Sequence, residues 1–441
     1  MEGRLFNMGE KGKELYENLK QKINRLSQEG TQEKQFVDFW RIACTAKYRS
    51  HDIKYLYDDS SREYIEKYKD TLVKMREDFI DNIDYYVDKC INVMRKTCNF
   101  KVYLASNNEE AQKYFMEEIG DHETIYKSCS SEALDIGLVE FAKKNNIKMI
   151  ETALGDKLDK WFEWKHPPYL LGGGVQFTPE EIATKIKELF GDDIEPDPQA
   201  ITFYIRDKFR PDMLKNVRVA LTSANAIAAD DGSIVICENS GNISLITRLA
   251  QKHIVAVGLT KIVPTFLDAC LVTKTLSRIN KVSQAYISII AAPSNTSSVQ
   301  GKSVQGMYGA REVTIILVDD WRKKATKENL IYKDLLKCVG CKTCDFICTA
   351  SRAFGNVFGS RYGLGATGII REYIHHGIEA AVKAGLFLCT GCEKCTNWCP
   401  VGTDLSEMMK SLKKEATNKG LCPPPLQDYR NKILQDKNPF R

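Results

Sequence analysis

The chain has 441 residues, of which 43% are apolar and 27% charged, and its formal net charge at pH 7 is +5. A chain of this length and composition can bury enough apolar surface for two or three separate cores, which excludes intrinsic disorder. No stretch reaches the roughly 18 apolar residues that a membrane span requires, and the charged amino terminus lacks an apolar signal-peptide core. We therefore expect a soluble, unexported protein.

The hydrophobic pattern predicts three segments in chain order. Residues 1–100 form an N-terminal helical region, because apolar residues from Ile65 to Met94 recur at steps of three and four. Residues 101–322 alternate short apolar runs with helical patterns, which is typical of an α/β domain with a mostly parallel sheet. Residues 323–441 lose the strand signal and are predicted to form an α-helical domain.

Positive charge is concentrated in this last segment, where residues 331–441 contain 16 Lys and Arg against 10 Asp and Glu. These basic residues are scattered singly and form no dense run or aromatic-interleaved patch, which argues against nucleic-acid binding. The excess is suited to offset the charge of a cofactor or to attract an acidic partner.

Two short cysteine motifs in the last segment follow the Cys-x2-Cys-x2-Cys-x3-Cys spacing of bacterial ferredoxins. Three thiolates at this spacing can wrap one face of a cubane cluster, whereas the fourth lies past a further turn and binds the other cluster. Two [4Fe-4S] clusters are therefore predicted. The predicted ligands are Cys338, Cys341, Cys344 and Cys399 for the first cluster, and Cys389, Cys392, Cys395 and Cys348 for the second.

Zinc is the alternative occupant, but structural zinc ordinarily takes two separated cysteine pairs and leaves no role for a third cysteine in the same run. Cysteines clustered in this way suit a metal centre rather than disulfides, so a reducing, cytoplasmic compartment is expected. The first motif has Thr349 where proline usually follows, which leaves ligation unaffected because proline is not a ligand. The helical pattern between the motifs resembles the dicluster domains of succinate dehydrogenase iron–sulfur subunits and heterodisulfide reductase subunits.

A G-x-G-x-x-G pattern at Gly363, Gly365 and Gly368 lies between the two motifs. It follows no predicted strand and lacks a βαβ context, so a tight turn into a helix beginning near Ile369 is favoured over dinucleotide binding. No Ser-His-Asp arrangement or carboxylate pair can be recognised from spacing, and the catalytic residues are therefore unknown at this point.

The α/β segment resembles the lactate-utilisation domain, and the order of parts resembles the B-type lactate-utilisation iron–sulfur protein family over almost the whole chain. The stretches that carry the resemblance, besides the cysteine motifs, are Lys127-Ser128 with the following SSEALDIGL, ETALGD at 151–156, TPEEI at 178–182, SANAIAADDGS at 223–233, Gly241-Asn242, and HIVAVGLTKIVPT at 253–265. The resemblance implies a fold like that of CoA transferases and NagB. It also implies a cytoplasmic complex that oxidises L-lactate to pyruvate, with a cysteine-rich subunit and a lactate-utilisation-domain subunit as partners.

Two departures from the family concern the α/β domain. The chain has Asp230-Asp231-Gly232-Ser233 where the family typically shows Glu-Thr-Gly-Thr, and Ser240 where it shows a glutamate before Gly-Asn. By analogy with the related folds, a pocket is expected near Asp231, Gly232, Asn242 and Lys261, although a fold does not determine a function. Asp231-Gly232 also lies between two apolar runs and predicts a hairpin with a two-residue turn.

Three functions remain open at this stage. The first is an iron–sulfur electron-transfer subunit of a complex that oxidises L-lactate or a related 2-hydroxy acid, inactive alone because clusters move single electrons. The second is an electron-wiring subunit of a heterodisulfide-reductase-like complex. The third is a small-acid binding or sensor protein with structural clusters. Cluster potentials span too wide a range for sequence to choose among them.

Overall fold

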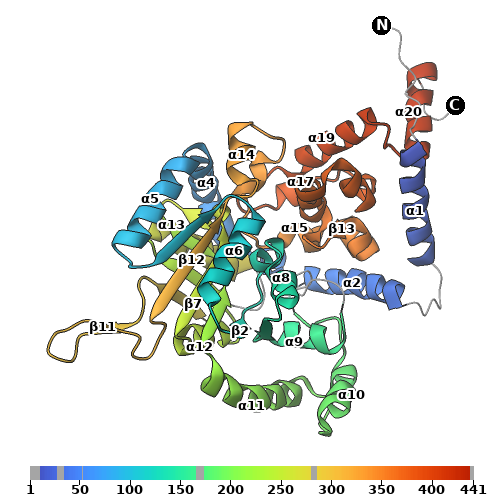
Figure 1. Cartoon of the computed structure of the whole chain (residues 1–441). Coiled ribbons are helices and arrows are strands. Elements are labelled where there is room, and N and C mark those ends of the chain that lie inside the picture. Colours follow the sequence, from blue (N-terminus) through green and yellow to red (C-terminus); the bar gives the residue numbers. More distant parts are fainter. Residues whose placement is uncertain (1–9, 27–33, 52, 165–172, 280–285, 438–441) are drawn as a thin grey trace. The chain divides into compact units, whose positions relative to one another are not determined.

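The computed structural model describes residues 10–26, 34–51, 53–164, 173–279 and 286–437 (Figure 1). Spatial contacts group the described residues into two units, one within 52–341 and the other within 1–51 together with 342–441. The helices of the first hundred residues are thereby shared between the units. The division at residues 100 and 322 stays a prediction.

The unit within residues 52–341 is an α/β domain, as the alternating pattern predicted. Its helices are α3 (Lys54–Tyr57), α4 (Asp59–Asp81), α5 (Ile83–Lys96), α6 (Asn108–Ile119), α7 (Ser131–Asp135), α8 (Leu138–Lys144), α9 (Leu154–Trp161), α10 (Pro179–Phe190), α11 (Pro198–Asn216), α12 (Asn242–Leu249), α13 (Phe266–Ile279) and α14 (Arg322–Lys327), with the 3-10 turns η2 (Leu259–Lys261) and η3 (Lys333–Lys337). Its strands are β1 (Lys101–Ala105), β2 (Thr124–Lys127), β3 (Lys148–Glu151), β4 (Val219–Thr222), β5 (Ala226–Ala228), β6 (Ile234–Glu238), β7 (Lys252–Gly258), β8 (Ile262–Val263), β9 (Tyr286–Ile290), β10 (Asn295–Thr296), β11 (Val304–Gln305) and β12 (Glu312–Val318).

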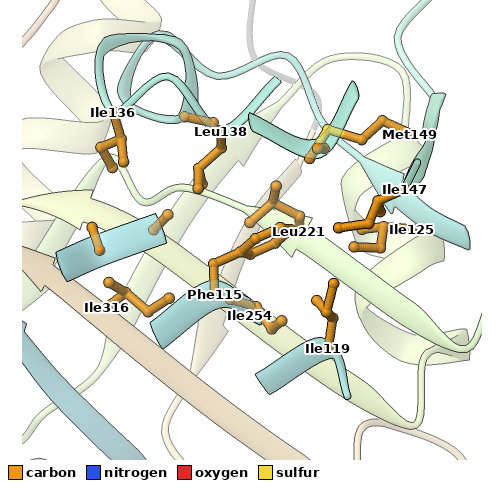
Figure 2. Close-up of a cluster of buried hydrophobic side chains, with 14 of the residues drawn as sticks. Phe115, Ile119, Ile125, Ile136, Leu138, Ile147, Met149, Leu221, Ile254 and Ile316 are labelled. Atoms are coloured by element: carbon orange, nitrogen blue, oxygen red, sulfur yellow. The ribbon is translucent and has the colours of Figure 1, made fainter. Parts of the chain in front are cut away.

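The main sheet has six strands in the order β1-β12-β7-β4-β2-β3, and every neighbouring pair is parallel. Successive side chains of a strand face opposite sides. On one side, Phe115 and Ile119 of α6 pack with Ile125 and Leu221, and Figure 2 shows the same core reaching Ile254. On the other side, residues of α11 and α12 pack with Tyr126 and Ala220. Helices on both faces are what a buried parallel sheet requires.

A second, four-stranded sheet has the order β8-β5-β6-β9. The predicted hairpin is confirmed, because β5 and β6 pair antiparallel with Ile227 opposite Ile234. Its loop runs from Ala229 to Ser233 and is longer than the two-residue turn expected from Asp231-Gly232. Gly232 supplies the positive φ, of 77°, that this loop requires.

The unit that contains the carboxyl-terminal segment is helical, as predicted. Its elements are α1 (Glu10–Leu26), α2 (Lys34–Ser50), α15 (Thr343–Ile347), α16 (Thr349–Phe354), η4 (Gly355–Phe358), β13 (Gly359–Ser360), β14 (Gly363–Leu364), α17 (Gly365–Lys383), η5 (Leu386–Leu388), α18 (Lys394–Asn397), α19 (Leu405–Asn418) and α20 (Pro424–Asp436). Helix α2 packs against α15 and α16, and α17 packs against α19. The short elements around the cysteines are thus held by three longer helices.

Candidate iron–sulfur site

Four cysteines from both motifs line a single pocket of the helical unit. Cys348 lies between α15 and α16, Cys389 follows η5, Cys392 lies in the loop before α18, and Cys395 lies in α18. The pocket has an empty volume of about 560 Å³, including the part open to solvent. These are the four side chains that sequence spacing assigns to the second cluster.

Backbone geometry explains how the chain curves around this pocket. Gly391 and Glu393 both have positive φ, of 70° and 60°, so the loop between Cys389 and Cys395 turns twice in the left-handed region. Gly365, with φ of 63°, lies against Cys348, where an added Cβ would be 3.7 Å from its Sγ. The left-handed conformation favours glycine at that position.

The G-x-G-x-x-G pattern has a packing role in the structure. Gly363 belongs to β14, α17 begins at Gly365, and a side chain at Gly368 would overlap the carbonyl oxygen of Gly363. The helix therefore starts four residues before the expected Ile369. The glycines allow a two-residue ladder and a helix start to approach closely beside Cys348.

The pocket thiols influence one another electrostatically. Burial, followed by the nearby Cys348 and Cys389, raises the pKa of Cys395 to about 12. Burial also raises the pKa of Cys348, and Cys389 adds to the shift. Thiolates bind metal, so in this pocket the positive charge of bound iron is needed to hold these cysteines deprotonated.

Basic side chains surround the same pocket. Lys413 donates from Nζ to the carbonyl oxygen of Cys389 at 2.6 Å, and Lys410 lies 3.0 Å from a carboxylate oxygen of Glu393. Lys394, Lys410 and Lys413 all line the pocket. Their charge favours a negatively charged occupant, such as a cluster with four thiolate ligands.

The cysteines predicted for the first cluster have defined surroundings within their own units. In the α/β unit, Cys338 follows η3 and its Sγ accepts from the N–H of Gly340 at 3.4 Å. In the helical unit, Cys344 Sγ lies 3.5 Å from a carboxylate oxygen of Asp345, and Cys399 Sγ accepts from the N–H of Thr403 at 3.3 Å. Backbone N–H groups that point at sulfur are typical of iron–sulfur sites, where they tune the potential.

Among the described residues, no group of three His, Cys, Asp or Glu side chains is placed to hold a single metal ion. A cubane cluster does not require such convergence, because each thiolate binds a different iron atom. The four cysteines that line one pocket, the mutual shift of their pKa values and the surrounding lysines fit a [4Fe-4S] cluster.

The residues named for the expected pocket of the α/β unit each have defined contacts, and the pocket itself stays a prediction. Asp231 accepts from its own neighbour Ser233, and the Gly232 turn packs against Cys98. Asn242 instead donates to Thr152 Oγ1 at 2.9 Å, while the Nζ of Lys261 lies near Gly340.

Sequence reasoning missed a buried charge cluster at the carboxyl ends of β2 and β3. Lys127 Nζ lies 2.6 Å from Glu151 and 3.2 Å from Asp156, and all three side chains are largely buried. Strands β2 and β4 are neighbours in the sheet, but the next strand of this sheet along the chain is β3 after β2, on one side, and β7 after β4, on the other. The strand order therefore reverses between β2 and β4, beside this cluster. Ligands of open α/β sheets bind at such points. The available signal was a lysine at the end of an apolar strand pattern.

Comparison with known proteins agrees with this architecture. Residues 92–318 match the model of the LUD domain, and residues 334–403 match a 4Fe-4S dicluster domain. The "Uncharacterized electron transport protein YkgF" of Escherichia coli is 25% identical over 361 residues, which are 81% of this chain and 73% of that protein. "Lactate utilization protein B" of Macrococcus caseolyticus is 26% identical over 350 residues, 78% of this chain and 70% of that one.

Fold and site thus define an α/β protein that carries a 4Fe-4S dicluster domain. Since the LUD model covers more than half of its length, the chain belongs to the LUD domain family. The order of domains expected from the sequence resemblance is confirmed. In the parts of the chain described here, no helix is long and apolar enough to cross a membrane.

Proposed function

We propose that this chain is the iron–sulfur electron-transfer subunit of a cytoplasmic complex that oxidises L-lactate, or a related 2-hydroxy acid, to pyruvate. In this proposal it holds two [4Fe-4S] clusters, the first through Cys338, Cys341, Cys344 and Cys399, and the second through Cys389, Cys392, Cys395 and Cys348. Its partners would be a cysteine-rich subunit and a second lactate-utilisation-domain subunit.

The observation that carries the proposal is the gathering of Cys348 with three cysteines of the other motif around one pocket. It supports the crossed arrangement of two-cluster ferredoxins, in which neighbouring clusters can exchange electrons. The lactate part of the proposal is supported by the names of the relatives and by the LUD domain.

The cysteines and their neighbours have defined tasks in electron transfer. The clusters, when bound, accept and release one electron at a time. Lys413 and the other pocket lysines offset the negative charge that reduction adds. The loop that contains Cys392 is exposed, which brings this side of the pocket within reach of a redox partner.

Lactate oxidation requires removal of a proton and the equivalent of a hydride, so another centre must split the electron pair before the clusters receive it. The centre is proposed to lie on a partner subunit. The chain alone should therefore transfer electrons without oxidising lactate.

The test compares the purified chain with the native complex, isolated without air. Each is given L-lactate and an artificial electron acceptor, and cluster reduction is followed by absorbance and EPR. The proposal expects lactate to reduce the clusters in the complex but not in the isolated chain. Lactate oxidation by the isolated chain would contradict the proposal that the oxidising centre lies on a partner subunit. Clusters that stay oxidised when the complex is given lactate would contradict the proposal that lactate is the substrate.

A further inference from the structure

Arg76 of α4 is a fully buried arginine in the α/β unit, with 1% of its surface exposed. Its guanidinium donates to three backbone carbonyl oxygens, those of Ile262 at 2.9 Å, Thr260 at 2.8 Å and Leu336 at 2.6 Å. The first two belong to the segment of η2 and β8, and the third belongs to η3. One side chain thus ties a helix, the α/β core and the chain entering the first cysteine motif.

The charge of Arg76 has no carboxylate partner within the described residues. Burial lowers the pKa of Arg76 to about 10, and the side chain of Cys338 acts against this shift. The guanidinium therefore remains charged at neutral pH. A buried charge is costly unless an opposite charge compensates it, and carbonyl dipoles supply only part of that compensation.

The neighbouring Lys337 shows the contrast. Its Nζ lies 2.7 Å from a carboxylate oxygen of Asp334 and 3.0 Å from one of Glu77, so two acidic groups already neutralise it. Arg76 is more deeply buried than Lys337 and has no carboxylate partner among the described residues. Arg76 donates to the carbonyl of Leu336, and Leu336 lies two residues before Cys338 in the chain.

The first motif approaches a second cation of the α/β unit at Gly340, which has φ of 76°. A Cβ at this glycine would lie 3.5 Å from the Nζ of Lys261. Two cations of the α/β unit therefore lie along the segment from Leu336 to Gly340. A cofactor with net negative charge at Cys338 would supply the charge that this arrangement lacks.

We propose that Arg76 is a positioning residue for the first cluster, which holds the segment before Cys338 in place and raises the reduction potential of that cluster. The inference rests on the proposed function, in that Cys338 must ligate a cluster. A reduced cluster carries one more negative charge than an oxidised one, so a buried cation beside it favours the reduced state. Arg76 thereby makes the first cluster easier to reduce than it would be without this buried charge.

The experiment is an EPR-monitored redox titration of the full-length chain, purified without air, as wild type and as R76M, R76K and R62M. R76M removes the charge and nearly keeps the length, whereas R76K keeps the charge. Arg62 lies on the same helix, about 21 Å away along its axis, and donates to the carbonyl of Leu56, so R62M is the matched control. A C338S variant identifies which EPR signal belongs to the first cluster.

R76M should make reduction of the first cluster at least tenfold less favourable, which is about 59 mV for a one-electron couple. The second cluster should keep its potential, R76K should recover most of the shift, and R62M should match the wild type. If R76M loses the first cluster altogether while R76K retains it, the need for the buried charge is equally supported.

Three outcomes would overturn the inference. They are an unchanged first-cluster potential in R76M, an equal shift of both clusters, and an R76K variant as impaired as R76M. Iron content of the wild type separates this test from that of the proposed function, because a chain without clusters contradicts both. A lactate test that fails in the complex leaves the role of Arg76 untouched.

Discussion

Cys348 and Cys395 come from different sequence motifs, yet they line one pocket and lie close enough for Cys348 to contribute to the raised pKa of Cys395. Cys389 acts on both thiols. The fourth cysteine of the first motif therefore shares a neighbourhood with the second motif.

Replacing Cys348 with serine should alter the cluster held by the second motif, because Cys348 lines the pocket of Cys389, Cys392 and Cys395. EPR of the reduced protein should show one changed signal, matching the signal changed by C395S. C422S is the control, since Cys422 is buried in the same unit outside both motifs. A changed signal that instead matches the C341S variant would show that each motif holds its own four ligands.

Protein purified without air should contain about eight iron and about eight acid-labile sulfide per chain, as two four-iron clusters require. Its broad visible absorption should bleach on reduction with dithionite. Iron and sulfide assays with metal analysis provide the measurement. About two zinc ions per chain with negligible sulfide would refute the cofactor assignment.

Replacing Lys127 with methionine should destabilise the α/β unit by about 3–5 kcal/mol, because Glu151 and Asp156 would remain buried without their cation. Urea unfolding followed by circular dichroism measures the change. Lys187→Met is the control, because its pair with Asp193 is exposed and should contribute about 1 kcal/mol or less. Equal losses of unfolding free energy in the two variants would show that the buried Lys127 cluster contributes no more to stability than an exposed ion pair.

Asp159 should make stability fall as the pH rises. Burial, then the charge of Asp156, raises the pKa of Asp159 in the folded protein to about 8, well above its ordinary value of 3.8. The folded state therefore binds a proton that the unfolded state has released, and this stabilising effect is lost as the pH rises through about 8. Gln176 donates to the same carboxyl group, and Glu151 adds its charge.

Between pH 6 and pH 8, the wild type should lose about 2 kcal/mol of unfolding free energy relative to Asp159→Asn, since each pH unit below the folded pKa corresponds to about 1.4 kcal/mol. Urea midpoints at several pH values measure this difference. Asp193→Asn, at an exposed position, should keep the slope of the wild type. Parallel pH profiles of the wild type and Asp159→Asn would show that Asp159 ionises normally.

Much of the architecture could be read from local patterns. Short apolar runs that alternate with helical periodicity require a parallel sheet covered on both faces, and the six parallel strands confirm it. The Thr-x-x-Glu spacing of Thr178 and Glu181 is typical of a helix start, and the two residues form the capping box of α10. The spacing of the cysteines predicts a ligand set for each cluster, because three thiols two residues apart can bind one face of a cubane cluster, and this assignment stays a prediction.

The sequence by itself determined the order of domains, the parallel sheet and the residues able to bind clusters, since each depends on neighbours within a few positions of the chain. Only the tertiary structure decided which groups meet across long separations. It placed Lys127 between Glu151 and Asp156, brought Asn242 to the hydroxyl of Thr152, and brought Arg76 to the carbonyl of Leu336. A charged residue on an amphipathic helix or at a strand end looks the same in sequence whether it faces water or a buried partner, because its cost and its compensation arise only when distant segments exclude water together.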